Sequence, residues 1–209
     1  MIQDFNCFVG NTIYLRLFEE SDFENTYLWR NDFELQVMTA GPIRFVSKEI
    51  EKEWVVSKSK SNAKELYLAI CAKENGKMIG YYSVTDIDLL NRSCHCGGIL
   101  IGDKDYRDGV AYLEVHHLVH RFLFQQLNMH RISGACLREH IISRAHMEAS
   151  NWKLEGIKRD AIFKNGCYHD IFEYSLLDCE YQQFIQNPIS QADYIKRFVA
   201  ISKQIKKQS

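Results

Sequence analysis

The sequence lacks long apolar runs, a basic leader and a marked net charge. No stretch of about 18 uninterrupted apolar residues occurs, so we expect no transmembrane helix and no membrane partner. The first residues, Met1-Ile2-Gln3-Asp4, contain no basic region followed by an apolar run, so we expect no signal peptide. The net charge of −1 provides no overall field that would attract nucleic acid, so no nucleic-acid partner is expected.

The sequence also lacks the cysteine spacing of a disulfide framework. Its seven cysteines are odd in number and scattered along the chain. This pattern favours free thiols in a reducing compartment, and we therefore predict a cytoplasmic location. The 209 residues suffice for one domain with a proper core, and the 46% hydrophobic and 25% charged residues are ordinary for a globular protein.

Hydrophobic periodicity predicts strands alternating with helices. The predicted strands cover residues 12–18, 65–72, 78–86, 94–102, 132–137, 152–163 and 168–177, and the predicted helices cover 48–57, 111–127 and 142–150. Ser21 to Glu24 reads as a capping box that starts a further helix running toward Trp29. Asn75-Gly76 and Asn165-Gly166 are predicted hairpin turns. This order of elements predicts a mixed sheet of the α/β or α+β class.

The last segment differs from the rest of the chain. Pro188 interrupts it, and residues 192–207 then read as an amphipathic helix ending in lysines. We therefore divide the chain into a domain of residues 1–178 and a C-terminal extension of residues 179–209. A helix packed on the body of the protein is the favoured interpretation, and a contact with a partner or a membrane is the alternative.

A strand, a short polar loop and a long helix follow one another between Cys94 and Leu127. The strand ends in Gly98-Ile99-Leu100-Ile101-Gly102-Asp103, the loop is Lys104-Asp105-Tyr106-Arg107-Asp108-Gly109, and an amphipathic segment begins near Ala111. A helix that opens after such a loop presents unpaired backbone N–H groups, which bind phosphate.

Two downstream segments complete a recognisable series, namely Met147 to Gly156 and Ala161 to Asp170. The whole series resembles the GNAT superfamily of N-acetyltransferases, in particular the RimJ/RimL-like branch that acetylates ribosomal proteins. The resemblance covers roughly residues 12–178. It implies a twisted, mixed, mostly antiparallel sheet of about seven strands with helices on both faces and a splayed pair of central strands. It also implies acetyl-CoA as cosubstrate, with no metal.

The resemblance implies a set of cofactor-binding residues. The thioester carbonyl would be held by the strand backbone at Ile99, Leu100 and Ile101. The family loop, Arg/Gln-x-x-Gly-x-Gly/Ala, matches imperfectly: Gly109 and Ala111 fit, and Tyr106 then takes the Arg/Gln position. The loop that would bind the pyrophosphate consists of Arg107, Asp108, Gly109, Val110, Ala111 and Tyr112, with Arg107 adding a charge-assisted contact.

Further family positions carry different residues here. His140, with Ser143 after it, takes the place of an Asn that contacts the pantetheine arm. Met147 replaces a Tyr that protonates the leaving thiolate. Because the coenzyme A thiol has a pKa of about 8.5, departure without an acid is not prohibitive.

The catalytic base is the least defined part of the prediction. The family Glu of the central strand corresponds to Cys96, with His95 beside it, and imidazole is a base suited to neutral pH. Because neighbours on a strand face opposite sides, only one of the two residues can face the cleft. Asp86 and Asp88, at the end of the preceding strand, are alternative carboxylates, and solvated loop-end positions are the other interpretation for both.

Two groups of side chains mimic metal sites. His116 and His120 stand four residues apart on the long helix, near Glu114 and His117, but no third ligand is evident. We therefore predict solvated histidines and a structural Glu114. Cys94-His95-Cys96 is too closely spaced for a tetrahedral site and reads as strand.

The acceptor amine is suggested by three weaker similarities. Trp29-Arg30-Asn31, the strand Gly80 to Ile87 and the loop Arg107-Asp108-Gly109 together resemble the nucleotide-amino-sugar acetyltransferases of the pseudaminic acid pathway. Arg30 would then bind a nucleotide phosphate, with Ser83 also on the substrate side. A protein N-terminus as acceptor and a non-catalytic acetyl-CoA-binding sensor are the alternatives, and a homodimer is compatible with all three.

Overall fold

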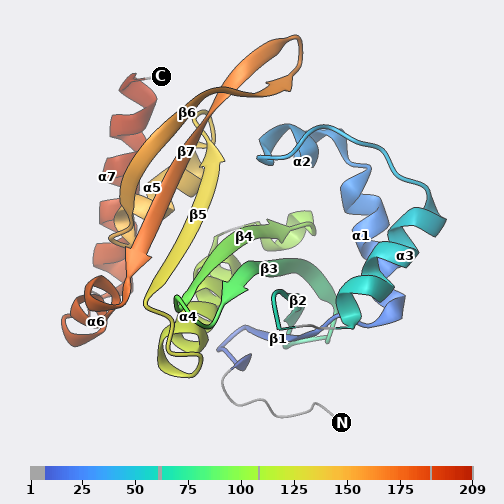
Figure 1. Ribbon diagram of the computed structural model, residues 1–209, viewed down its shortest axis with the longest axis horizontal. Helices are drawn as coiled ribbons and strands as arrows, with labels where there is room; N and C mark the ends of the chain where they lie inside the picture. The colour runs from blue at the N-terminus through green and yellow to red at the C-terminus, as the bar shows by residue number, and fades with distance from the viewer. Residues whose placement is uncertain (1–7, 61–62, 108, 189, 209) are drawn as a thin grey trace. The chain divides into compact units, whose positions relative to one another are not determined.

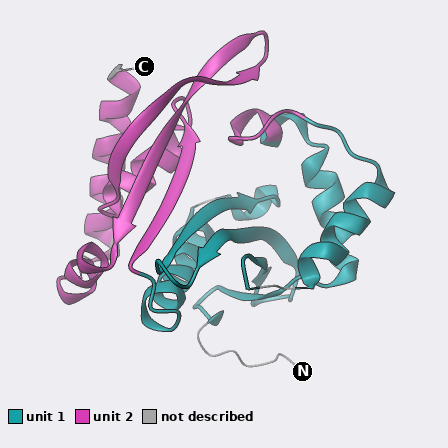
Figure 2. Cartoon of the chain, in the orientation of Figure 1, with its two compact units in different colours: residues 1–35, 44–129 teal, residues 36–43, 130–209 magenta. Residues whose placement is uncertain are grey.

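A computed structural model describes residues 8–60, 63–107, 109–188 and 190–208. The chain forms two compact units, coloured separately in Figure 2. The first unit comprises residues 1–35 and 44–129, and the second comprises residues 36–43 and 130–209. The described part of the chain contains seven strands, all paired antiparallel within their unit, together with α-helices. The predicted mixed α/β class is therefore confirmed.

The first unit contains four consecutive strands, each antiparallel to the next. They are β1 (Ile13–Leu17), β2 (Leu66–Ala72), β3 (Met78–Asp88) and β4 (Ser93–Ile101). The turn between β2 and β3 contains Gly76 at a φ of 73°, a conformation that glycine adopts without strain. The predicted Asn75-Gly76 hairpin is thus confirmed, and the predicted strand boundaries are correct to within a few residues.

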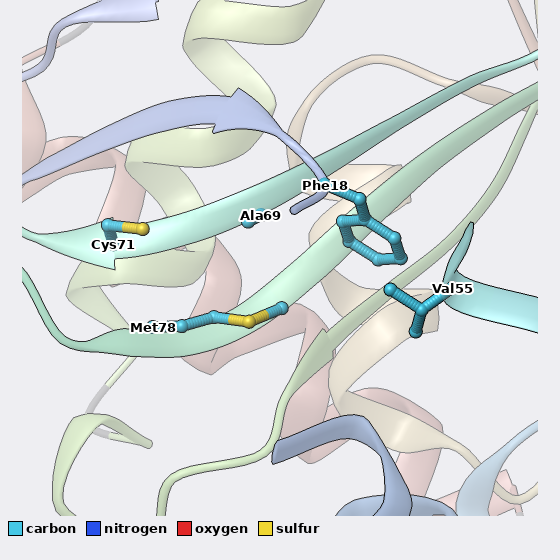
Figure 3. Close-up of a cluster of buried hydrophobic side chains, with 5 residues drawn as sticks. All are labelled: Phe18, Val55, Ala69, Cys71 and Met78. Carbon is cyan, nitrogen blue, oxygen red and sulfur yellow. The ribbon is translucent and has the colours of Figure 1, made fainter. Parts of the chain in front are cut away.

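Two helices, α1 (Phe23–Arg30) and α3 (Lys48–Ser59), pack on one face of these strands. Ser47 caps α3 by accepting a hydrogen bond from the Ile50 amide. Figure 3 shows the core cluster formed there, in which Phe18, Val55, Ala69, Cys71 and Met78 are all buried. Tyr14, Phe23, Trp29, Trp54, Tyr67 and Tyr81 surround the cluster. This face is called the α3 face below.

The opposite face of the same strands is covered by α4 (Val110–Gln125), seen behind them in Figure 1. The amphipathic character predicted for this segment is confirmed, because Val115, Leu118, Val119 and Leu123 form an apolar stripe that is almost completely buried. Phe122, at the edge of the stripe, packs its ring 4.9 Å from that of Phe8. This face is called the α4 face below.

The second unit has three strands in the order β5-β7-β6. They are β5 (Arg131–Leu137), β7 (Cys167–Leu177) and β6 (Lys153–Lys164), and β7 pairs antiparallel with both neighbours. Its helices are α5 (Ile141–Ala149), α6 (Asp178–Gln186) and α7 (Gln191–Gln208). Asn165 and Gly166, at φ values of 49° and 81°, form the predicted hairpin turn between β6 and β7.

The C-terminal helix α7 packs along α5, as the packed-helix interpretation predicts. The Tyr194 hydroxyl lies 2.7 Å from Nδ1 of His146, and Ile205 is buried. Burial raises the pKa of Tyr194 to about 12, so its hydroxyl stays protonated at neutral pH. None of the described helices combines the length and apolar character needed to cross a membrane.

Three local predictions were wrong or incomplete. The capping box before α1 is formed by Glu19 and Asp22 rather than by Ser21 and Glu24, because a 3-10 turn precedes the helix. Two short helices, α2 (Phe33–Met38) and α6, were not predicted. The six residues of α2 contain too few turns for a clear periodic signal.

Lys164, the last residue of β6, is only 3% exposed. Its ammonium donates hydrogen bonds to the carbonyl oxygens of Gln36 at 2.6 Å and Thr39 at 2.5 Å, where α2 ends. Unpaired carbonyls at a helix C-terminus favour such a cation. Burial lowers the pKa of Lys164, and the carbonyls provide the hydrogen bonds that its buried ammonium needs.

Candidate active site

The pairing of β3 with β4 is interrupted by a bulge at Gly97. Ser83 pairs with Gly98 and Val84 pairs with Cys96, so Gly97 is the extra residue on β4. A bulge bends its strand and re-aims the side chains beside it, and bulges are frequent next to active sites. The Gly97-Gly98 pair is the one feature of the sequence that could have indicated its position.

His95 lies beside this bulge on the α3 face. It pairs with Thr85 across the strands, and a Cβ placed on Gly97 would lie 3.5 Å from its ring. The same Cβ would lie 3.3 Å from the Ser83 hydroxyl and 3.4 Å from that of Thr85. Gly97 is exposed and His95 is half-buried, so an imidazole and two hydroxyls surround an accessible point on the strand.

Cys96 faces the other way, into the interior under α4. It is 8% exposed and hydrogen-bonds to Cys94 and His120. The bond with Cys94 is the largest cause that lowers the pKa of Cys96, and it raises that of Cys94. The alternation of the strand thus separates the two candidate bases, and burial against α4 argues against any contact of Cys96 with a substrate.

The prediction of solvated histidines on α4 was wrong for two of the three. His116 and His120 are only 8% and 6% exposed, and their ring centroids lie 5.3 Å apart. Both rings point toward the strands, on the side of α4 that also bears the buried valines. His116 contacts the Tyr82 ring and His120 contacts Cys96, both on the α4 face. His117 is exposed. Among the described residues, no group of three His, Cys, Asp or Glu side chains is arranged to bind a metal.

The end of β4 and the loop after it are held by several contacts. The amides of Gly102 and Asp103 both donate to the Ile79 carbonyl, at 2.9 and 3.0 Å. The Arg107 guanidinium donates to the carbonyls of Ile101 at 2.9 Å and Gly102 at 2.7 Å. Arg107 therefore fixes the strand end, a role that the sequence analysis did not assign to it.

Trp29 of α1 packs directly on Gly102. A Cβ placed on Gly102 would lie 2.1 Å from the indole ring, far closer than any real carbon contact. The requirement for glycine here comes from this ring and not from backbone conformation. The sequence does not indicate this packing role of Trp29, because Gly102 lies far from it in the chain.

Replacing Gly102 with alanine is expected to lower the free energy of unfolding by about 1–3 kcal/mol, because the added methyl group overpacks the site. Thermal unfolding measures the loss. Gly156→Ala is the matched control, since nothing lies within 4 Å of a Cβ at that position. Combining Gly102→Ala with Trp29→Ala should cost less than the sum of the two single changes. Strict additivity would contradict the contact.

The loop leads into α4 through Gly109, which has a left-handed φ of 91°. Among the described residues, no side chain caps this helix N-terminus and none lies within 4 Å of a Cβ built on Gly109. Backbone amides of Val110, Ala111 and Tyr112 form the first turn of a 16-residue helix, the arrangement that attracts phosphate. Asp108 lies outside the described residues. This helix start fits a pyrophosphate group.

Glu114, on the next turn of α4, has the structural role that was predicted. Its carboxylate accepts hydrogen bonds from the Thr12 amide at 3.0 Å, from the Thr12 hydroxyl at 2.5 Å and from the Asn11 amide. The carboxylate thereby anchors the chain that enters β1 to α4.

In the second unit, His140 is the N-cap of α5. Its Nδ1 accepts a hydrogen bond from the Ser143 amide at 3.1 Å. Burial lowers the pKa of His140, which keeps the ring neutral and able to accept that bond. The Nδ1 of His140 is thus used by the Ser143 amide, which leaves Nε2 of His140 and the Ser143 hydroxyl as the side-chain groups for a ligand.

Arg30 is bound within the first unit. Its Nε lies 3.0 Å from the Glu51 carboxylate, whose side chain is 1% exposed, and its guanidinium lies 4.1 Å from the Trp54 ring centroid. These contacts engage Nε and one face of the guanidinium that was predicted to bind a nucleotide phosphate, and the side chain is 33% exposed. Glu51 was not singled out from the sequence, because a glutamate on a helix is usually solvated.

Asp86 is exposed at the far end of β3, with a positive φ of 53°. The Thr85 hydroxyl donates to its carboxylate at 3.1 Å. A cavity of about 590 Å³ adjoins this strand end and is lined by Ala63, Lys64, Glu65, Thr85, Asp86 and Ile87. Thr85 lines this cavity and also pairs with His95 across the strands, so the cavity adjoins His95.

Residues 12–152 match the family described as Acetyltransferase (GNAT) domain, which is about two thirds of the chain. The chain therefore belongs to the GNAT acetyltransferase family, as the resemblance predicted.

Individual relatives are more distant. The chain is 27% identical over 108 residues to a protein of Bacillus subtilis (strain 168) provisionally named as a ribosomal N-acetyltransferase, YdaF. That alignment covers 52% of this chain and 58% of the relative, so the chain matches little more than half of the relative's length.

Solved structures support the fold. A spermidine N-acetyltransferase from Vibrio cholerae, in complex with CoA and spermine, superposes with a TM-score of 0.74 at 19% identity, over 83% of this chain and 99% of that one. A GCN5-related N-acetyltransferase from Brucella melitensis gives a TM-score of 0.70 at 21% identity, over 88% and 86%.

Proposed function

We propose that this protein transfers the acetyl group of acetyl-CoA to a primary amine, by direct attack of the amine within a ternary complex. The observation that carries the proposal is the bulge at Gly97, which brings His95, Ser83 and Thr85 around one exposed point of β4. Membership in the GNAT family indicates the class of reaction, and the N-terminus of α4 is suited to binding a pyrophosphate group.

In this proposal His95 accepts the proton that the amine releases as the new amide bond forms. The hydroxyls of Ser83 and Thr85, which lie on the same face, orient the amine by hydrogen bonds. The cavity of about 590 Å³ at Thr85 and Asp86 is the proposed approach for the rest of the acceptor. Cys96 is left out of the mechanism because it is buried under α4.

On the cofactor side, acetyl-CoA supplies an activated acyl group when bound. The backbone at Ile99, Leu100 and Ile101 is proposed to polarise the thioester carbonyl. The first amides of α4, at Val110, Ala111 and Tyr112, would hold the pyrophosphate, and the left-handed conformation of Gly109 turns the chain into this helix start. Arg107 would serve this site by fixing the strand end, where it already binds two carbonyls.

The identity of the acceptor is a separate question. A nucleotide-linked amino sugar, suggested by three sequence similarities, is the first candidate, although the Arg30 side chain that would bind its phosphate pairs with Glu51. A protein N-terminus is the second candidate, and the name of the Bacillus subtilis relative favours it. The cytoplasmic location and the homodimer are predictions on which the proposal does not depend.

Acetyl-CoA is expected to raise the thermal midpoint of unfolding. A ligand at about 100 times its dissociation constant adds about 2.7 kcal/mol of stability, which corresponds to roughly 5–10 °C for a chain of this size. Coenzyme A should act similarly, whereas ATP serves as the control nucleotide and should have no such effect. No shift at millimolar acetyl-CoA would limit the family relationship to the fold.

Turnover then separates an enzyme from a sensor. Release of coenzyme A should be measured with amino sugars, their nucleotide-linked forms, polyamines and peptides with free N-termini. Turnover with any member of this panel supports the proposed reaction and identifies the class of acceptor. Binding of acetyl-CoA without turnover across the panel would favour the non-catalytic sensor.

A further inference from the structure

Three side chains in the second unit form a chain of contacts that acetyl transfer does not use. The Cys167 thiol lies 3.2 Å from Nε2 of His169, and Nδ1 of His169 lies 3.3 Å from the Glu139 carboxylate. Cys167 is exposed, whereas the His169 side chain is 20% exposed and that of Glu139 is 53% exposed. A nucleophile, a base and a group that orients the base thus contact one another in that order.

The local structure explains this arrangement. The Asn165-Gly166 turn reverses the chain so that Cys167 pairs with Lys164 at the start of β7. Cys167 and His169 are two residues apart on one strand, so their side chains share a face. Glu139 follows the end of β5, the strand that pairs with β7 on its other side.

The groups around His169 allow it to accept the proton of the Cys167 thiol. Nε2 of His169 also lies 3.2 Å from the Lys164 carbonyl oxygen, and the Cys167 thiol lies 3.5 Å from the same oxygen. Acceptors therefore face both ring nitrogens: the Glu139 carboxylate at Nδ1, and the carbonyl and sulfur at Nε2. An imidazole that takes a second proton would find a hydrogen-bond acceptor for each N–H. The Lys164 ammonium donates to carbonyls at the end of α2, so it is not part of the cluster of Cys167, His169 and Glu139.

The other described cysteines do not share these features. Cys71, Cys94, Cys96 and Cys136 are buried. Cys179, on the first turn of α6, is exposed, and within the described residues it has no hydrogen bond to a histidine. Cys179 is therefore a built-in reference for an ordinary surface thiol.

We propose that Cys167 is an activated thiol that exchanges with small-molecule disulfides, with His169 as its proton acceptor and Glu139 as the residue that positions His169. In the exchange, the thiol passes its proton to His169 and its sulfur attacks one sulfur of the disulfide. The disulfide bond breaks, a mixed disulfide forms on Cys167, and the departing thiolate recovers the proton from the imidazolium. The small disulfide is the oxidant, and one thiol is released for each Cys167 modified. This proposal is independent of acetyl transfer.

The test measures modification of individual cysteines in the full chain. The protein is treated with 5,5′-dithiobis(2-nitrobenzoic acid) at pH 7, quenched at intervals with acid and mapped by mass spectrometry. Cys167 is expected to react at least about tenfold faster than Cys179, because a positioned base assists proton removal. Oxidised glutathione, used as a second probe, should show the same preference. Equal rates at the two cysteines would overturn the proposal.

Two variants test the assigned roles. His169→Asn should lower the Cys167 rate to about that of Cys179, and Glu139→Gln should lower it by a smaller factor. The Cys179 rate and the protection of the four buried cysteines should stay unchanged, which shows that each variant remains folded. Undiminished reactivity of Cys167 in H169N, with the buried thiols still protected, would exclude His169 as the base.

Discussion

Replacing His95 with asparagine is expected to lower kcat/KM for the amine acceptor by about 100-fold, the lower end of what a positioned base contributes. The imidazole lies beside the Gly97 bulge, together with the hydroxyls of Ser83 and Thr85. Among the described residue pairs of β3 and β4, His95 is the one histidine. Asparagine keeps a polar side chain of similar reach but cannot accept a proton at neutral pH. Release of coenzyme A at saturating acetyl-CoA measures the effect.

Acetyl-CoA binding supplies the control for this prediction. His95 lies on the α3 face, whereas the proposed pyrophosphate site is the start of α4, so the thermal shift with acetyl-CoA should be the same in H95N as in the native protein. Asp86→Asn tests the competing carboxylate and is expected to cost less than tenfold, because Asp86 is exposed at the strand end. Full activity in H95N together with a large loss in D86N would move the base to Asp86.

Replacing Arg30 with methionine is expected to lower the free energy of unfolding by about 3 kcal/mol at pH 7. Removing one partner of a buried ion pair typically costs 3–5 kcal/mol, and the 33% exposure of the Arg30 side chain places the cost at the lower end. The loss arises because the Glu51 carboxylate, at 1% exposure, would remain in the interior without its cation. For a chain of this size the thermal midpoint should fall by roughly 6–12 °C.

The pH dependence of that loss provides a second measurement. Burial raises the pKa of Glu51 above its ordinary value of 4.5, so the folded state binds the proton more tightly than the unfolded state. The stability that this contributes is present below pH 4.5 and is lost as the pH rises through the folded-state pKa. Without Arg30 the carboxyl should favour its neutral form still more, so the deficit of R30M should shrink as the pH is lowered from 7 toward 4.5.

A double variant separates the ion pair from simple packing. Arg30→Met combined with Glu51→Leu removes both charges, and most of the lost stability should return, because well-packed apolar residues replace buried ion pairs at little cost. Unchanged stability in R30M alone would show that the pair contributes little. Arg30 would then be available for a substrate phosphate, which would favour the nucleotide-linked amino sugar.

The class of the fold and the order of its elements follow from local sequence patterns. Strand and helix patterns depend on neighbours a few residues apart, so the stripe of α4 and the two Asn-Gly turns could be predicted from local chemistry. The same holds for the loop before α4, where Gly109 adopts the left-handed conformation that glycine permits. The GNAT relationship rests on this ordered series, and the match over residues 12–152 confirms it.

The contacts between distant side chains follow from the packing of the folded chain. Arg30 and Glu51 are 21 positions apart, and Trp29 and Gly102 are 73 apart, so no local pattern could pair them. Because side chains alternate along β4, only one of His95 and Cys96 could face the cleft. The packing of α4 shows that Cys96 is the buried one of the two. The same packing buried His116 and His120, which sequence reasoning had placed in solvent, because the face of a helix that meets a sheet depends on partners distant in the chain.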